Sequence, residues 1–223
     1  YSVWVSGPDI PGFERRYRYI YPLLSPLIRS VWRHATPVIA KCAGEIELIK
    51  AVDDSIEVTF IPNGVDLSVF RPGPGTPDKG QLHVVCVARL IERKGQHYLI
   101  DAVKRIVDSG IDVILSLIGT GDSKREYENQ ARSLGIQDRV RFVGYVSREE
   151  ISKYYKAAHV FVLPSYNEGM SLAVLEAMAS GLPVVVTRTG GTAELVEEGV
   201  NGFVFNWGDV ETLSRHLLNL ASD

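Results

Sequence analysis

Two glutamates in the C-terminal third of the chain flank a predicted helix start. Glu168 lies in a loop, and Glu176 falls about one turn inside a helix predicted over residues 171–180. Ser171 is a good N-cap residue for this helix, and the first-turn amides that lack intrahelical partners form an anion site. One carboxylate on each side of such amides suits a ligand that carries both phosphates and many hydroxyl groups.

Two cations in another loop fit the same ligand. Arg89 and Lys94 follow an apolar strand predicted over residues 82–88. The arginine fork supplies paired donors and the lysine ammonium a compact charge, so the pair is suited to clamping a diphosphate. The alternative is that both are ordinary solvated surface charges.

Strands and helices that could position these residues alternate strictly from residue 82 onward. The strands are near-continuous apolar runs, which is typical of strands covered on both faces. Strands are predicted at 82–88, 111–118, 140–143, 159–163, 183–187 and 203–205, and helices at 95–109, 123–134, 147–157, 171–180, 192–198 and 209–221. This pattern predicts an α/β fold with a doubly wound parallel sheet, in which ligands bind beyond the carboxyl ends of the strands.

The loops at these predicted strand ends are rich in small and polar residues, which let a ligand approach backbone amides. One of them, Gly119-Thr120-Gly121, is half of a dinucleotide-binding fingerprint. The third glycine of that fingerprint is replaced by Lys124, and the acidic residue some twenty positions on, Asp138, precedes its strand instead of ending it. Nicotinamide or flavin binding is therefore the weaker interpretation.

A glycosidase is another alternative, because hydrolysis of a glycosidic bond uses two carboxyl groups. Glu176, however, has the core-like neighbours Val174, Leu175 and Ala177. It is better placed to hold hydroxyl groups than to transfer protons. A structural role, as a surface carboxylate or a cap partner, is the remaining alternative for either glutamate.

Residues 1–61 are predicted to form part of a further α/β unit. We expect strands at 3–5, 37–40 and 57–61, and helices at 13–34 and 43–51. A Pro/Gly-dense stretch over 71–80 has the composition of a linker. The predicted organisation is an incomplete N-terminal unit over 1–61, an interdomain crossover over 62–81 and a ligand-binding domain over 82–223. An incomplete sheet would leave an unpaired strand edge, so self-association is a further hypothesis.

The predicted helix over residues 13–34 carries five arginines against one glutamate, interleaved with tyrosines and a tryptophan. Such a basic aromatic segment can lie on an anionic membrane, here at its inner face. The simpler interpretation is a solvated helix whose aromatic side chains pack on the sheet.

Composition excludes several classes of protein. A net charge of −3 argues against nucleic acid as the main partner. Cys42 and Cys86 lie far apart in apolar runs, so we expect buried thiols with no disulfide and no metal site. A reducing, cytoplasmic location is the simplest interpretation.

Several of these segments resemble the motifs of a known family. Glu168 and Glu176, within the run EGMSLAVLEAMASGLPVV, resemble the E-x7-E motif of retaining glycosyltransferases with the GT-B fold, most closely family four. Further matching segments are Ile61–Asp66 with Phe70, Val87–Leu90 with Lys94 and Gly95, Gly119–Gly121, Phe142–Val146, and Gly190 and Gly191 with Glu194.

The resemblance implies an activity and a role for each matched position. Members of the family transfer a sugar from a nucleotide diphosphate donor to an acceptor with retention, usually without a metal, so no cofactor is expected. Arg89 and Lys94 would hold the diphosphate, Glu168 would contact the sugar and Glu176 the ribose hydroxyls. The remaining predicted donor-binding residues are the amides of Met170, Ser171 and Leu172, the backbone at Tyr145 and Val146 near the nucleobase, and Gly119, Gly144 and Gly169.

The chain also departs from the family pattern. Members carry an N-terminal domain whose first half supplies a Gly-rich loop and a histidine near the reacting sugar, and none of the five histidines here sits in that motif. We therefore expect the chain to bind UDP or GDP, or their sugars, and to transfer sugar poorly, with a glycan, a lipid or a small molecule as the acceptor. The alternatives are a non-catalytic nucleotide-binding module and a related GT-B nucleotide-sugar epimerase or phosphorylase.

Overall fold

The computed structural model describes residues 1–73 and 80–222, except for the side chain of Arg15. Contacts between residues divide the chain into two compact units. The first unit comprises Tyr1–Gly64, Asn167–Ser171 and Thr189–Leu195, and the second comprises Val65–Tyr166, Leu172–Arg188 and Val196–Asp223. Part of the predicted crossover over 62–81 lies outside the described residues, and the predicted domain limits stay a prediction.

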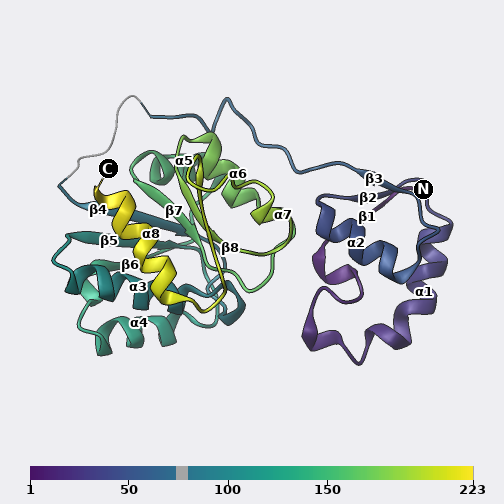
Figure 1. Ribbon diagram of the computed structural model, residues 1–223, viewed down its shortest axis with the longest axis horizontal. Coiled ribbons are helices and arrows are strands. Elements are labelled where there is room, and N and C mark those ends of the chain that lie inside the picture. Colours follow the sequence, from purple (N-terminus) through teal and green to yellow (C-terminus); the bar gives the residue numbers. More distant parts are fainter. Residues whose placement is uncertain (74–79, 223) are drawn as a thin grey trace. The chain divides into compact units, whose positions relative to one another are not determined.

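The second unit is built on a six-stranded parallel sheet (Figure 1). The strand order is β6-β5-β4-β7-β8-β9, so the direction of winding reverses between β4 and β7. This is the predicted doubly wound α/β fold, which is confirmed. The strands are β4 (Leu82–Val87), β5 (Val113–Ile118), β6 (Val140–Gly144), β7 (Val160–Leu163), β8 (Val184–Thr187) and β9 (Gly202–Phe205).

Helices of the second unit follow the strands in alternation. They are α3 (Gln96–Asp108), α4 (Lys124–Ser133), α5 (Arg148–Lys156), α6 (Leu172–Ala179) and α8 (Val210–Ser222), with short 3-10 turns η3 (Glu92–Lys94) and η4 (Gln137–Arg139). Leu99, Val103 and Ile106 of α3 share one helical face and are fully buried among apolar strand residues. This apolar packing holds the carboxyl edge of the sheet in place.

Helix α6 ends where the sequence predicts. Gly181 adopts a φ of +84° and donates its N–H to Met178 O over 2.9 Å, while Leu182 N–H reaches Ala177 O over 3.1 Å. These two bonds form a Schellman motif, which a glycine permits at no steric cost.

The helix predicted over 192–198 is wrong. The helix there is α7 (Gly190–Ala193), and the chain beyond it turns back into β9. Gly199, at a φ of +76°, donates to Gly202 O over 2.9 Å, and Glu198 forms a β-bridge with Gly202. The turn before β9 uses the backbone groups that a longer helix would need.

The first unit contains a three-stranded parallel sheet in the order β1-β2-β3, and residues 1–64 of this unit add two helices to it, beside the short helix α7. The elements within residues 1–64 are β1 (Val3–Trp4), η1 (Gly7–Asp9), η2 (Arg15–Tyr17), α1 (Tyr21–Arg33), β2 (Val38–Ala40), α2 (Ala43–Val52) and β3 (Val58–Phe60). Its core is formed by Val5, Ile10, Trp32, Val38, Ala40, Ile49 and Ile56. The predicted set of three strands and two helices is present in this unit.

Helix α1 begins at Tyr21 and not at residue 13, so the prediction placed its start too early. Pro22 lies in the first turn, where its missing N–H is not needed. A helix running through from residue 13 would lose a hydrogen bond at Pro22 and bring its ring against a preceding carbonyl. Pro22 therefore favours a helix start at this position, while a second proline, Pro26, lies inside α1.

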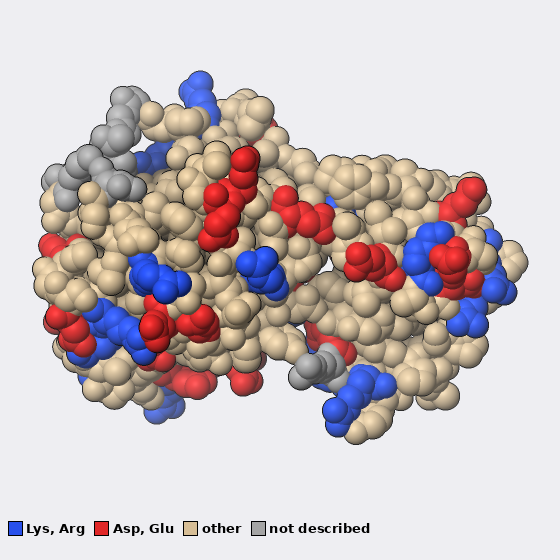
Figure 2. Space-filling model, viewed as in Figure 1, with Lys and Arg blue, Asp and Glu red and all other residues tan. Residues whose placement is uncertain are grey.

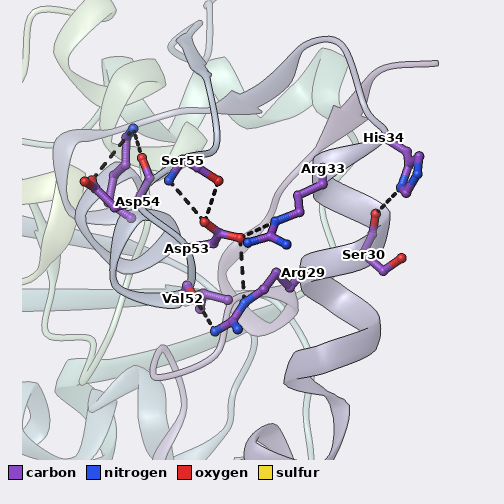
Figure 3. Close-up of polar contacts among 9 residues, drawn as sticks. Arg29, Ser30, Arg33, His34, Val52, Asp53, Asp54 and Ser55 are labelled. Carbon is purple, nitrogen blue, oxygen red and sulfur yellow. Dashed lines mark hydrogen bonds and ion pairs between the residues drawn. The ribbon is translucent and has the colours of Figure 1, made fainter.

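A polar network ties α1 to the end of α2 (Figure 3). Asp53 lies 2.6 Å from Arg33 Nε and 3.7 Å from Arg29 Nε through its Oδ2 atom. Its Oδ1 atom accepts hydrogen bonds from the hydroxyl and the N–H of Ser55 over 2.7 and 3.1 Å. Mainly because of the Ser55 hydroxyl, and then of Arg33, the pKa of Asp53 is lowered to about 2.

Charged side chains of both signs are mixed over the second unit on the face drawn in Figure 2. This distribution agrees with the modest net charge of −3. In the parts of the chain that the structure describes, no helix is both long and apolar enough to cross a membrane.

Candidate functional site

A cavity of about 420 Å³ opens at the carboxyl ends of β4, β5 and β6 in the second unit. It lies beside the point where the strand order reverses, which is where open parallel sheets bind ligands. Its walls are formed by Val87, Ala88, Arg89, Ile118, Gly119, Tyr145, Val146, Arg148, Ile151, Leu172 and Glu176.

Six of the predicted site residues share this cavity. They are Arg89, Gly119, Tyr145, Val146, Leu172 and Glu176. Gly144 ends β6 at the same edge, and its carbonyl accepts the N–H of Gly119 over 2.8 Å. The loops that were predicted to lie at the carboxyl ends of the strands therefore meet at one cavity of the second unit.

Glu176 is held from behind by a buried tyrosine. The hydroxyl of Tyr155 donates a hydrogen bond to Glu176 Oε2 over 3.1 Å. Tyr155 is fully buried, with Phe70 and Phe161 as ring neighbours at centroid distances of 6.0 Å each. Burial raises the pKa of Glu176, although the Tyr155 hydroxyl and the charge of Arg148 act in the opposite direction. The pKa of Tyr155 is raised by its burial and by Glu176, so it stays a donor.

Two cations line the cavity. Arg89 follows β4, and Arg148 begins α5. Against the single carboxylate of Glu176 they leave an excess of positive charge, while Val87, Ile118 and Ile151 supply apolar wall. An anionic ligand with a flat apolar part suits such a lining. Sequence reasoning missed Arg148, although it directly follows the loop in which Tyr145 and Val146 were singled out.

The loop that carries Arg89 and Lys94 is tightly braced. Gln96 Nε2 donates to Arg89 O over 2.9 Å, and Lys94 N–H donates to Ile91 O over 2.9 Å. Gly95 adopts a φ of +69°, and a Cβ there would lie 2.0 Å from Pro164 O. Lys94 is thus the last residue of a turn whose next position, 95, requires a glycine. Within the described part of the chain, the residues that line the cavity do not include Lys94.

Gly119 and Gly121 have a packing role that the sequence did not indicate. A Cβ on Gly119 would lie 2.2 Å from Ala88 O, and one on Gly121 would lie 2.2 Å from Leu90 O. Leu90 N–H also donates to Thr120 O over 2.9 Å. Gly119 and Gly121 are therefore needed because the loop after β5 packs closely against the loop after β4.

The remaining predicted residues, Glu168 to Ser171, belong to the first unit. Gly190 packs on the backbone of Glu168, since a Cβ at this glycine would lie 2.3 Å from Glu168 O. Thr192 Oγ1 donates to Gly169 O over 3.2 Å. Ser171 directly precedes α6, and its capping role stays a prediction. Within residues 1–73 and 80–222, no three His, Cys, Asp or Glu side chains are grouped to hold a metal ion.

Comparisons with known proteins agree with this fold. Residues 72–223 match the family model described as glycosyl transferases group 1. The putative colanic acid biosynthesis glycosyltransferase WcaL of Escherichia coli (strain K12) is 30% identical over 215 residues, which cover 92% of this chain and 52% of that protein. The chain spans about half the length of the curated relatives it matches.

Solved structures share the fold. Sucrose-phosphate synthase from Thermosynechococcus elongatus is 25% identical with a TM-score of 0.84, over 100% of this chain and 58% of that one. Anabaena Alr3699/HepE in complex with UDP and glucose is 25% identical with a TM-score of 0.81, over 100% of this chain and 62% of that one.

Proposed function

The chain belongs to the glycosyl transferases group 1 family, and from this membership we propose that it binds a nucleotide-diphosphate sugar and serves its transfer to an acceptor with retention of configuration. The observation that carries the proposal is the cavity at the carboxyl ends of β4 to β6, in which Arg89, Arg148 and Glu176 converge on apolar walls. The relative HepE, whose structure holds UDP and glucose, supports a UDP donor. GDP is the alternative.

The proposed roles follow from the chemistry of each group. The nucleobase packs at Tyr145 and Val146, and the ribose hydroxyls donate to Glu176. Arg89 and Arg148 bind the diphosphate with Lys94, and Glu168 contacts the sugar. As the bond to the sugar breaks, negative charge grows on the diphosphate, and prepositioned cations stabilise it without rearranging. These cations take the part that a metal ion plays in other transferases, so chelation should leave binding unchanged.

Calorimetric titration with UDP, GDP and UDP-glucose tests the proposal. We expect one nucleoside diphosphate to bind, and the Kd to be unaffected by a chelator. Glu176→Ala should weaken the binding of UDP about tenfold, because a hydrogen bond to a charged group is lost. Glu168→Ala should weaken only UDP-glucose. Glu47→Ala, an exposed carboxylate on α2, is the matched control.

Two results would count against the proposal. Absence of binding by every nucleoside diphosphate at high protein concentration would remove the donor site. Equal effects of Glu176→Ala and Glu168→Ala on UDP would contradict the division of roles. Retention is tested separately, by proton NMR of the first-formed product of a productive donor and acceptor pair.

A further inference from the structure

Another cavity of the second unit, of about 290 Å³, lies between η3, the start of α3 and α4. It is lined by Glu92, His97, Glu126, Tyr127 and Gln130. Helices α3 and α4 each follow the carboxyl end of a strand, so the cavity lies on the carboxyl side of the sheet. None of its lining residues lines the donor cavity, so it is a separate candidate site.

Two neutral polar side chains of this cavity have defined hydrogen-bonding roles. Gln130 Nε2 donates to His97 O over 3.0 Å and to Asp101 Oδ1 over 2.8 Å, so both amide hydrogens are used and Oε1 is left as an acceptor. Burial lowers the pKa of His97, although Asp101, Glu126 and Glu92 act in the opposite direction. A neutral imidazole can donate from one nitrogen and accept at the other.

Two carboxylates of the cavity have no cation as a partner. Within the described part of the chain, no ion pair joins Glu92 or Glu126 to a basic side chain, and Lys124 pairs with Glu128 at 3.5 Å. Each carboxylate has two acceptor oxygens, which suit two adjacent hydroxyl groups of one ligand.

A buried tyrosine adds a polar group with unused capacity. Tyr127 is 1% exposed, and its hydroxyl forms no hydrogen bond with the described residues. Burial raises its pKa, as do Glu126 and Glu92, while the side chain of Ser123 lies near enough to oppose the rise. The hydroxyl therefore keeps its proton, and a ligand oxygen would supply the missing acceptor.

Aromatic rings continue from this cavity along the carboxyl side of the sheet. The ring centroid of His97 lies 6.0 Å from that of Tyr127 and 4.0 Å from that of Tyr98. Trp207 meets Tyr98 and Tyr166 edge to face, at centroid distances of 5.1 and 4.9 Å. Trp207 is 39% exposed, and Tyr98 and Tyr166 are half-buried. We call these five residues the ring row.

We propose that the cavity and the ring row bind a glycan, with one sugar unit in the cavity and the next unit on Trp207. The C–H faces of a sugar pack against aromatic rings, whose faces carry partial negative charge, and its hydroxyl groups pair with the carboxylates and with Gln130 Oε1. A volume of about 290 Å³ is at the small end of the range for ligand pockets, which fits a single sugar unit. This site goes beyond the proposed function, because it lies apart from the donor cavity.

An alkylammonium ligand is the competing occupant, because the carboxylates would attract it. Two observations favour the sugar. Lys124 and Arg125 directly precede Glu126 and offset its charge. An ammonium group also has donors only, so it would leave the Tyr127 hydroxyl and the His97 N–H without an acceptor, whereas a sugar hydroxyl both donates and accepts.

Calorimetry and saturation-transfer NMR with maltose, cellobiose and lactose test the proposal. We expect at least one disaccharide to bind, with a Kd that saturating UDP and about 1 M salt leave unchanged, because the ligand is neutral. Trp207→Ala should raise this Kd about tenfold, as is typical of truncating a central aromatic contact. Trp207→Phe keeps a ring and should raise it less, which covers a failure of the alanine variant to fold.

Substitutions in the cavity separate the two ligand classes. Glu126→Ala should raise the Kd of the disaccharide about tenfold, whereas Glu126→Gln keeps an acceptor and should raise it about threefold. A bound ammonium group would be lost in both variants alike. Spermidine, titrated at low salt, is the probe for that class.

Matched controls lie on the first unit. Trp4→Ala removes a tryptophan that is 59% exposed, and Glu47→Ala removes an exposed carboxylate of α2. Both should leave the Kd of the disaccharide unchanged. Each variant is also titrated with UDP alone, so that a failure of this site is distinguished from a failure of the donor site.

Four outcomes would overturn the proposal. The first is no binding by any of the three disaccharides. The second is the same Kd in Trp207→Ala and Trp4→Ala, which would exclude stacking on the ring row. The third is displacement of the disaccharide by UDP, which would place the sugar in the donor cavity. The fourth is binding of spermidine in place of every disaccharide, which would assign the cavity to an ammonium ligand.

Discussion

The hydroxyl of Tyr155 donates a hydrogen bond to Oε2 of Glu176 over 3.1 Å, from a position that is fully buried. This places a fixed donor behind the carboxylate that lines the cavity. The second carboxylate oxygen is left to the cavity side in the proposed mode of donor binding. The relationship also sets the protonation of Glu176, because burial raises its pKa and the Tyr155 bond opposes the rise.

Removing this bond should therefore change how donor binding depends on pH. A protonated Glu176 accepts poorly from ribose hydroxyls, so binding weakens as the pH falls through its raised pKa. Tyr155→Phe should raise that pKa further and move the midpoint to higher pH. Calorimetry with UDP-glucose between about pH 8 and pH 5 measures this midpoint. UDP-glucose is used in place of UDP because UDP itself has a phosphate ionisation near pH 6, which would overlap with that of Glu176.

Glu176→Gln is the control for this titration, since it should abolish the dependence attributed to the carboxyl group. If Tyr155→Phe and the unchanged protein have the same pH midpoint, the Tyr155 hydroxyl does not affect the pKa of Glu176.

Arg148 should contribute to phosphate binding through its charge. Arg148→Gln is expected to weaken UDP about fivefold, as is typical of the loss of one charge-assisted hydrogen bond, and to leave the binding of uridine nearly unchanged. Arg125→Gln, on α4, should affect neither ligand. If uridine and UDP weaken equally, Arg148 acts on the shape of the cavity and not through its charge.

Gly95 and Gly110 form a natural pair for testing close packing. Both have positive φ values, +69° and +83°, but a Cβ would meet Pro164 O at 2.0 Å at Gly95 and open space at Gly110. Gly110→Ala should lower the free energy of unfolding by about 1 kcal/mol, from backbone strain alone. Gly95→Ala should lower it by about 3 kcal/mol, because overpacking adds to the strain. Urea denaturation measures both, and equal losses would contradict the predicted clash.

Asp53 should stabilise the first unit in a pH-dependent way. Its folded pKa of about 2 lies below the usual value of 3.8, so its contribution is complete above pH 3.8 and is lost as the pH falls toward 2. Asp53→Asn should therefore lower the urea midpoint at neutral pH, and the difference from the unchanged protein should shrink below about pH 4. Asp54→Asn is the control, because Asp54 is 96% exposed and lies 3.9 Å from Lys50. A loss in Asp53→Asn that stays constant down to pH 2 would exclude the ionic contribution.

Errors in the sequence-based predictions have physical causes that can be named. The helix predicted over 13–34 was expected to bend at Pro22 and continue, whereas Pro22 lies in the first turn of a helix that begins at Tyr21. The helix over 192–198 has a helical composition, but the backbone before β9 is used in a turn and a bridge. In both cases a local pattern was overruled by a requirement for backbone hydrogen bonds.

The sequence by itself determined the alternation of strands and helices, the buried face of α3 and the end of α6 at Gly181. It also determined the loops that carry Arg89, Gly119 and Tyr145, and the helix that carries Glu176. These features follow from periodicity and from the backbone freedom of glycine, which act over a few neighbouring residues. Tertiary structure alone decided that Tyr155 faces Glu176, that Arg148 joins the cavity, that Gly119 and Gly121 serve loop packing, and that the leucines of α1 stay exposed. Each of these depends on contacts between segments far apart in the sequence, and no local pattern records which segments will meet.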